Sequence, residues 1–230
     1  MDAYTKHELT GVPFITVKVA QSLDGRIACE GGDSRWISSS ATREVAHRLR
    51  SDHDGVMVGI GTVLKDDPQL TVRLVEGKNP CRIVVDSNLR IPPNARIITD
   101  KESCRTIIAT TSKADGKNIA VLESLGAQVL IIEKDDNNRV NLRTLLGVLG
   151  EKGISSILIE GGSEIITTLL RDNLVDKLVV IIAPKIIGQG IESVKDLGIR
   201  RVNEAITFSE TKVDTVGADI VFEGIIAHRV

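Results

Sequence analysis

The chain has 230 residues, of which 42% are hydrophobic and 26% charged, with a formal net charge of −2. This composition excludes disordered and collagen-like chains, and the length predicts one domain or at most two small ones. The charge and the scarcity of aromatic residues argue against a nucleic-acid binder, which has a basic face or a base-stacking surface. The cysteines and histidines match no ligand spacing, so we expect no metal site. The chain has no apolar leader and no apolar run of membrane length, so we expect a cytoplasmic protein with no membrane partner.

Short runs rich in valine and isoleucine recur along the chain, and each predicts a strand. They lie at residues 14–20, 55–60, 81–86, 106–110, 128–132, 157–160, 177–183 and 219–227. Helical spacing occurs between them, at residues 40–50, 117–125, 140–151 and 163–171. This alternation predicts a three-layer α/β fold with a mainly parallel sheet. From about residue 205 the tail predicts a C-terminal antiparallel hairpin around Gly217, and hence one mixed sheet in one domain.

Polar segments follow several of these strands, at residues 22–26, 61–73 and 86–93. Ligands of open α/β sheets bind beyond the carboxyl ends of strands, so these segments could surround one site. Each is also ordinary turn chemistry, in which aspartates accept hydrogen bonds from backbone N–H groups. The adjacent carboxylates Asp66 and Asp67 favour capping over a catalytic pair.

A glycine pair separates the strand at 157–160 from the helix at 163–171. Glycines at such a turn let backbone N–H groups approach an anion, and the positive end of the helix dipole adds to the attraction. Gly161 and Gly162 therefore indicate either a phosphate site or a tight turn that needs glycine torsions.

Three further residues have both a structural and a functional interpretation. Lys18 interrupts an apolar strand, so its side chain is either solvated or buried with a partner. Trp36 is either a surface anchor or a wall against a flat ligand. Glu160 either faces a site or caps the following helix.

Five segments in this order and spacing resemble the riboflavin-biosynthesis pyrimidine reductases. This family comprises the C-terminal half of bifunctional RibD and the stand-alone archaeal and fungal reductases. The segments are VKVAQSLDGRIA (17–28), SRWISS (34–39), GIGTVLKDDPQLTVR (59–73), RIVVDSNLRIP (82–92) and ILIEGGSEII (157–166). The resemblance covers residues 12–227, so we expect a single reductase domain at 12–230 preceded by an extension at 1–11.

The resemblance implies a dihydrofolate-reductase-like fold, a homodimer and an NADPH-dependent oxidoreductase. The implied reaction reduces a ribosylaminopyrimidinone 5′-phosphate, either the 2,5-diamino or the deaminated form, to the ribitylamino compound. Hydride comes from the cofactor, so the protein supplies orientation, phosphate binding and proton management.

The resemblance also implies roles for individual residues. Our own candidates for the catalytic residues, in proton transfer or polarisation of the imine, are Lys18 and Glu160. The expected cofactor-binding residues are Ala20, Trp36, Thr62, Asp66, Ser87, Gly162, Ser163, Glu164, Ile165, Ile166, Thr167 and Thr168. The expected substrate-binding residues are Ser34, Arg50, Leu70, Arg73 and Glu160. Beyond the resemblance, we infer from its place near Ser87 that Arg90 is a candidate partner of the adenosine 2′-phosphate. Asp24 is expected to order the segment at 22–26, with contact to the substrate as the alternative.

Bifunctional RibD also carries a zinc deaminase, whose ligand motifs this sequence lacks, so we expect no deamination. Two other interpretations stay open. One is a dihydrofolate-reductase-like enzyme acting on another substrate, and the other is a non-catalytic NADPH-binding regulator. An enzyme with another substrate gives no reason for Arg50, Arg73 and Glu160 together, whereas a phosphorylated sugar does. A regulator that has lost activity would also have lost these substrate residues, and the sequence retains them.

Overall fold

The computed structural model describes residues 2–100 and 105–227, and the chain forms two compact units. The first unit comprises the residues up to Phe14 together with Arg48–Leu158, and the second comprises Ile15–His47 and the residues from Ile159 onward. Two elements straddle the boundary: helix α2 (Ala41–Ser51) and strand β7 (Ser156–Glu160). The last residues of the predicted domain, 228–230, lie outside the described residues.

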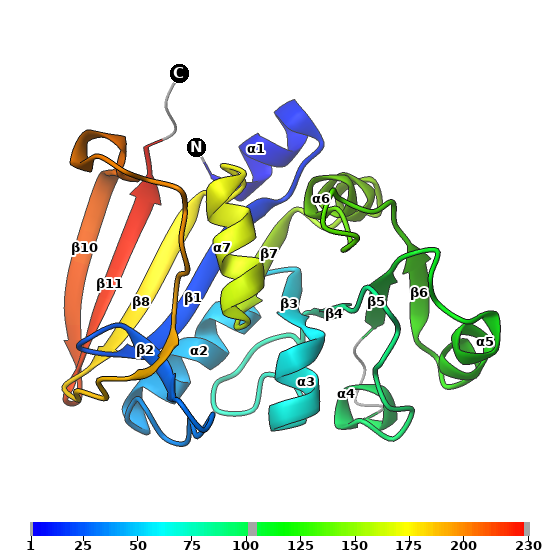
Figure 1. The fold of residues 1–230 in the computed structure, drawn as a ribbon, viewed down its shortest axis with the longest axis horizontal. Coiled ribbons are helices and arrows are strands. Elements are labelled where there is room, and N and C mark those ends of the chain that lie inside the picture. Colours follow the sequence, from blue (N-terminus) through cyan, green and yellow to red (C-terminus); the bar gives the residue numbers. More distant parts are fainter. Residues whose placement is uncertain (1, 101–104, 228–230) are drawn as a thin grey trace. The chain divides into compact units, whose positions relative to one another are not determined.

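The first unit is built on four parallel strands. In the order β3 (Gly55–Gly59), β4 (Cys81–Val85), β5 (Thr106–Thr110) and β6 (Gln128–Ile131), each pairs with the next (Figure 1). The apolar runs of β3, β4 and β5 are buried, as expected for strands covered on both faces, whereas β6 is only partly buried and its Ile131 is exposed. The helices of this unit are α1 (Ala3–Thr10), α3 (Ile60–Asp66), α4 (Arg96–Thr99), α5 (Gly116–Ser124) and α6 (Leu142–Glu151).

The second unit contains both parallel and antiparallel pairs. Strand β1 (Phe14–Ser22) runs parallel to β8 (Lys177–Ala183), and β11 (Asp219–Ile226) runs antiparallel to β8. Strand β10 (Phe208–Val216) pairs antiparallel with β11, which confirms the predicted C-terminal hairpin. Helix α7 (Ser163–Arg171) and the 3₁₀ helix η1 (Val202–Glu204) complete the unit, together with a two-stranded sheet of β2 (Arg26–Cys29) and β9 (Gly190–Glu192). Figure 1 shows β10, β11, β8 and β1 side by side.

The predicted α/β fold with a mixed, mainly parallel sheet is thus confirmed. Each predicted strand forms within one or two residues of its expected bounds, because a buried strand needs only a continuous apolar run. The sequence pattern did not predict α1, α3, α4, β2 and β9, which are short and carry little apolar periodicity. Among the described residues, no helix combines the length and apolar character needed to cross a membrane.

One carboxylate ties the start of β3 to the start of β7 within the first unit. Asp54 Oδ2 accepts hydrogen bonds from the backbone N–H of Ser155 at 2.9 Å and of Ser156 at 3.1 Å, and from the Ser155 hydroxyl at 2.6 Å. Partial burial alone would raise the pKa of Asp54, but these donors outweigh it, so the pKa lies below its usual value.

We expect Asp54→Ala to lower the free energy of unfolding by about 1–2 kcal/mol, because it removes the acceptor of these donors. A carboxyl whose pKa is lowered by folding stabilises the protein above its unfolded pKa of about 4, and this contribution is lost as the pH falls through the lower folded pKa. Urea titrations at neutral and acidic pH measure both effects. A wild-type advantage over the variant that persists unchanged at low pH would contradict the assignment.

Candidate active site

Lys18 and Glu160 form an ion pair inside the second unit. Lys18 lies in the middle of β1, Glu160 is the last residue of β7, and Nζ lies 4.0 Å from Oε2. Their side chains are only 15% and 9% exposed. The pair therefore settles the interpretation of Lys18: the lysine is not solvated, and its charge is matched by a carboxylate. A sheltered ammonium and carboxylate side by side can hold and exchange a proton.

The glycine pair follows Glu160 directly. Gly161 has φ 101° and Gly162 has φ 85°, so both positions adopt a backbone that favours glycine. Gly162 precedes α7, and the first N–H groups of a helix have no acceptor within it. The turn therefore needs glycine torsions, and its geometry is also compatible with an anion at the helix N-terminus.

Most side chains of α7 are buried in the core or bonded to other residues of the protein. Ile165 and Ile166 are buried in the core. The Thr167 hydroxyl donates to the Ser163 carbonyl at 2.6 Å and accepts from the Lys195 N–H at 2.9 Å. Glu164 is paired with Lys195 Nζ. A ligand at this helix would accordingly contact backbone N–H groups of its first turn more readily than these side chains.

Trp36 lies in an irregular segment of the second unit and is 66% exposed. The Arg43 guanidinium stands over its ring, 4.9 Å from the ring centroid. Lys185 Nζ donates to the Trp36 carbonyl at 2.7 Å. Ser34, two residues earlier, is half-buried, as is Ala20 on β1. The indole is thus exposed, but Arg43 contacts its ring and Lys185 holds the backbone of the same residue.

The remaining predicted cofactor residues lie in the first unit. Thr62 and Asp66 belong to α3, which begins directly after β3. The neighbouring Asp67 ends that helix with φ 41°, and its Oδ1 accepts from the Arg96 N–H at 2.8 Å. Asp67 is therefore a capping residue, in line with the structural interpretation of this aspartate pair.

Two of the predicted substrate residues approach the same stretch of backbone. Arg50 Nη1 donates to the Thr71 carbonyl at 3.0 Å, and Arg73 is hydrogen-bonded to Gln69. Arg50 is half-buried and Arg73 is exposed. Leu70 is only 3% exposed, and its side chain packs in the apolar core.

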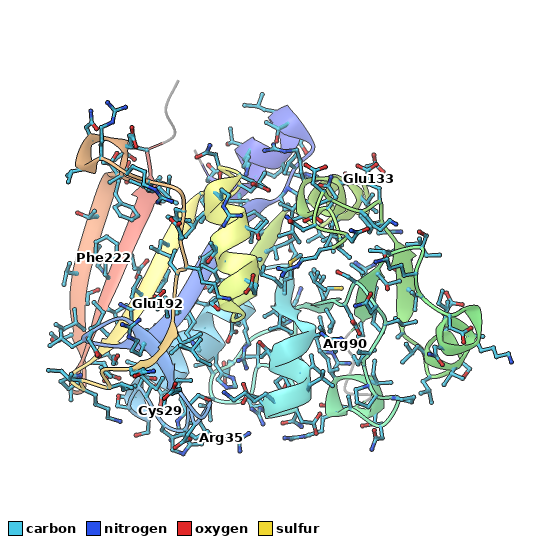
Figure 2. All side chains as sticks on the ribbon, in the orientation of Figure 1. Cys29, Arg35, Arg90, Glu133, Glu192 and Phe222 are labelled. Carbon is cyan, nitrogen blue, oxygen red and sulfur yellow. The ribbon has the colours of Figure 1, made fainter. Side chains whose placement is uncertain are left out.

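The segment after β4 is organised by a buried carboxylate. Asp86 Oδ2 accepts from the Ile91 N–H at 2.8 Å, and Arg90 Nε lies 3.9 Å from Oδ1. Burial raises the pKa of Asp86 despite the hydrogen bonds from Ile91 and Arg90. The Ser87 hydroxyl accepts from the Val140 N–H at 3.0 Å. Arg90 itself is exposed (Figure 2).

Asp24 orders its own segment, as expected, and a second segment as well. Its carboxylate accepts from the Ser22 hydroxyl at 2.6 Å and from the Gly188 N–H at 2.6 Å. The hydrogen bond from Ser22, followed by those from Gly188 and Ile187, lowers the pKa of Asp24 to about 2. No local sequence pattern pointed to the segment that contains Gly188, or to Lys185, Arg43 and Asp219, because their contacts join distant parts of the chain.

Comparison with known proteins gives consistent results. Residues 13–222 match the model of the RibD C-terminal domain family. The chain is 41% identical over 210 residues to the riboflavin biosynthesis protein RibD of Aquifex aeolicus, covering 91% of the chain and 56% of that protein. It is 37% identical over 216 residues to the 2,5-diamino-6-ribosylamino-4(3H)-pyrimidinone 5′-phosphate reductase of Methanothermobacter thermautotrophicus, covering 92% of the chain and 97% of that protein.

Solved structures agree in fold. RibD of Acinetobacter baumannii superposes with a TM-score of 0.85 at 29% identity, covering 98% of the chain and 61% of that protein. Dihydrofolate reductase of Enterococcus faecalis, 13% identical, gives a TM-score of 0.53 over 94% of the chain and 97% of that protein, which supports the predicted dihydrofolate-reductase-like fold. The chain spans between half and two thirds of the length of the RibD proteins that it matches. Sequence, fold and family model together show that this chain belongs to the RibD C-terminal domain family of riboflavin-biosynthesis reductases.

Proposed function

We propose that this chain reduces the ribosyl side chain of a ribosylaminopyrimidinone 5′-phosphate to the ribitylamino compound, with NADPH as reductant, in riboflavin biosynthesis. The observation that carries the proposal is the sheltered Lys18–Glu160 pair next to the Gly161–Gly162 turn. The name of the Methanothermobacter relative, which the chain matches over nearly its whole length, supports the same substrate. We expect the enzyme to act in the cytoplasm.

The chemistry requires one hydride and one proton. In the ring-opened imine form of the substrate, hydride adds to C1′ and a proton adds to the nitrogen, so that the C=N bond becomes a C–N single bond. NADPH supplies the hydride when bound, and is left as NADP⁺. Lys18 would donate a hydrogen bond or the proton to that nitrogen. Glu160 would hold the ammonium in place and accept from the ribose hydroxyls.

The residues of the chain suit a dinucleotide cofactor. The two glycines with positive φ and the first turn of α7 offer backbone N–H groups to a pyrophosphate. We assign the cofactor to this turn and to Ala20, Trp36, Thr62, Asp66 and Ser87. Arg90 is exposed and could pair with a 2′-phosphate, which would favour NADPH over NADH.

Arg50 and Arg73 are the proposed ligands of the substrate phosphate. A guanidinium group can donate two parallel hydrogen bonds to phosphate oxygens. Arg50 is anchored on the Thr71 carbonyl, which places its guanidinium against the segment that contains Arg73. Ser34 and the backbone around Leu70 complete the proposed substrate contacts.

The proposal includes a homodimer. On β8, β10 and β11, five apolar residues share one sheet face, with Ile220 opposite Ile182, Phe222 opposite Val180, and Val213 opposite Phe222. Val213 and Ile220 are exposed, and the other three are only partly buried. A contiguous apolar face of this kind is typical of a subunit interface. Light scattering that reports a monomer at micromolar concentration would contradict this part.

The decisive experiment supplies the aminated and the deaminated pyrimidine separately and follows NADPH absorbance, with dihydrofolate as control. We expect turnover of one pyrimidine in strong preference to the other, which also determines the order of reduction and deamination. NADPH binding without turnover of either pyrimidine would contradict the reductase assignment.

The proposed division between substrate and cofactor residues makes a separate prediction. Arg73→Ala should raise the KM for the pyrimidine about tenfold or more, by removing a charged phosphate donor, and should leave the Kd for NADPH little changed. Asp66→Ala should raise the Kd for NADPH and leave the KM for the pyrimidine little changed. Steady-state kinetics and NADPH titration measure both. Equal losses of both affinities in each variant would refute the division.

A further inference from the structure

The segment at residues 34–39, which we call the Trp36 loop, is held at two points by residues that are distant in sequence. At the first point, the Lys185 ammonium donates to the Trp36 carbonyl at 2.7 Å. Lys185 is exposed and lies just after β8, in the segment Pro184–Gly188. Figure 2 labels Arg35, the neighbour of Trp36, in this part of the second unit.

The second point is the tip of the β10–β11 hairpin. Asp219, which is buried, accepts from the Ser39 N–H at 2.7 Å and from the Thr42 hydroxyl at 2.8 Å, both through Oδ2. Gly217 has φ 62°, and a Cβ built there would lie 3.3 Å from the Ala41 Cβ, so the hairpin tip lies against the start of α2. The C-terminal hairpin therefore reaches the end of the Trp36 loop.

The second point is held by a charged carboxylate. Burial would raise the pKa of Asp219, but the hydrogen bonds from Ser39 and Thr42 and the positive charge of Lys185 lower it, so the carboxylate stays charged. A charge-assisted hydrogen bond of this kind is stronger than a neutral one.

The segment that contains Lys185 is itself anchored. Asp24 accepts from the N–H groups of Ile187 and Gly188, and the Leu23 N–H donates to the Lys185 carbonyl at 2.7 Å. Arg26 Nε donates to the Gly188 carbonyl at 2.9 Å, and Arg26 also pairs with Glu192 of β9, labelled in Figure 2. The backbone under Lys185 is thus held by hydrogen bonds on both sides.

We propose that Lys185 and Asp219 are positioning residues, which hold the Trp36 loop in the conformation that binds the nicotinamide dinucleotide. The inference rests on the proposed function, in which Trp36 contacts the cofactor. An exposed loop that must order itself on binding loses affinity, whereas a loop that is already held does not pay this entropic cost. Neither residue needs to touch cofactor or substrate for this effect.

Trp36 is the only tryptophan of the chain, so its fluorescence reports the state of this loop directly. Excitation at the red edge of tryptophan absorption avoids the single tyrosine. We expect Lys185→Met to lower the fluorescence anisotropy of Trp36 in the absence of ligand. We also expect it to raise the Kd and KM for NADPH about tenfold, with kcat little changed. Lys185→Arg, which keeps a cationic donor, should restore most of the affinity.

Asp219→Asn is the second variant, and its Trp36 anisotropy and NADPH affinity are measured in the same way. Its thermal midpoint is measured as well, because Asp219 is buried and the substitution can lower stability. Two control variants remove ion pairs on β8, the strand that precedes Lys185, and on β10, the hairpin partner of the strand that begins at Asp219. Lys177→Met breaks the pair with Glu223 at the start of β8, and Asp214→Asn breaks the pair with Lys212 on β10. Both controls should leave Trp36 anisotropy and NADPH affinity unchanged.

The outcomes separate this inference from the proposed function. If the wild-type protein turns over the pyrimidine and Lys185→Met leaves NADPH affinity unchanged, the inference is wrong, whether or not the anisotropy of Trp36 falls. If the wild-type protein binds NADPH with energy transfer from Trp36 but reduces neither pyrimidine, the proposed function is wrong. In that case a tenfold loss of NADPH affinity in Lys185→Met still supports the positioning role.

Discussion

Replacing Lys18 by methionine is expected to lower kcat for the pyrimidine by about 10²–10⁴, the range typical of removing a group that transfers or polarises a proton. The Kd for NADPH should change little, because the methionine side chain has a similar length and the glycine turn is untouched. Stopped-flow measurement of NADPH oxidation in a single turnover separates the chemical step from binding and product release.

A loss of stability could imitate this result, because the variant leaves the sheltered carboxylate of Glu160 without its cation. We expect a cost of about 2 kcal/mol, between the values for exposed and buried ion pairs. The double variant Lys18→Met/Glu160→Gln removes both charges and should regain most of the stability but none of the activity. Recovery of activity in the double variant would mean that the pair is structural.

The second large effect is expected at the glycine turn. Gly162 has φ 85° and ψ 92°, which residues with a side chain rarely adopt, so Gly162→Ala should cost about 1–3 kcal/mol of stability. If the turn also binds the pyrophosphate, displaced N–H groups should raise the Kd for NADPH about 10–100-fold. The rise in thermal midpoint that NADPH produces should shrink accordingly, because ligand stabilisation depends on the ratio of concentration to Kd.

Gly153→Ala is the matched control for this prediction. Gly153 follows α6 with φ 78°, and a Cβ there would meet nothing within 4 Å, so the substitution brings similar backbone strain without a new contact. It should lower stability and leave NADPH affinity unchanged. If both variants lose the same stability and both keep their NADPH affinity, then Gly161–Gly162 is only a tight turn and does not bind the pyrophosphate.

Much of this protein follows from local sequence. The parallel strands could be predicted because a strand buried on both faces must be apolar throughout, as in Val56, Met57 and Val58. The hairpin at Gly217 and the glycine turn before α7 could be predicted because both need torsions that glycine adopts without strain. The family could be recognised because its motifs lie in the loops that follow these strands.

Other features depended on contacts that no local pattern encodes. Lys18 within an apolar strand indicated only that the lysine was solvated or paired, and the position of Glu160 decided between them. Leu70 lies within a motif of the predicted site, but its side chain is buried in the core. Asp24, Lys185 and Asp219 contact segments that lie between 149 and 180 residues away in sequence. Their targets became visible only in the folded chain.

The sequence by itself determined the fold class, the family and the residue types available for chemistry, because periodicity, glycine torsions and loop motifs are local properties. The tertiary structure alone decided which charges are paired, which motif residues are buried and what holds the Trp36 loop. The physical reason is that ion pairs and charge-assisted hydrogen bonds act over a few ångströms in space, whatever the separation along the chain.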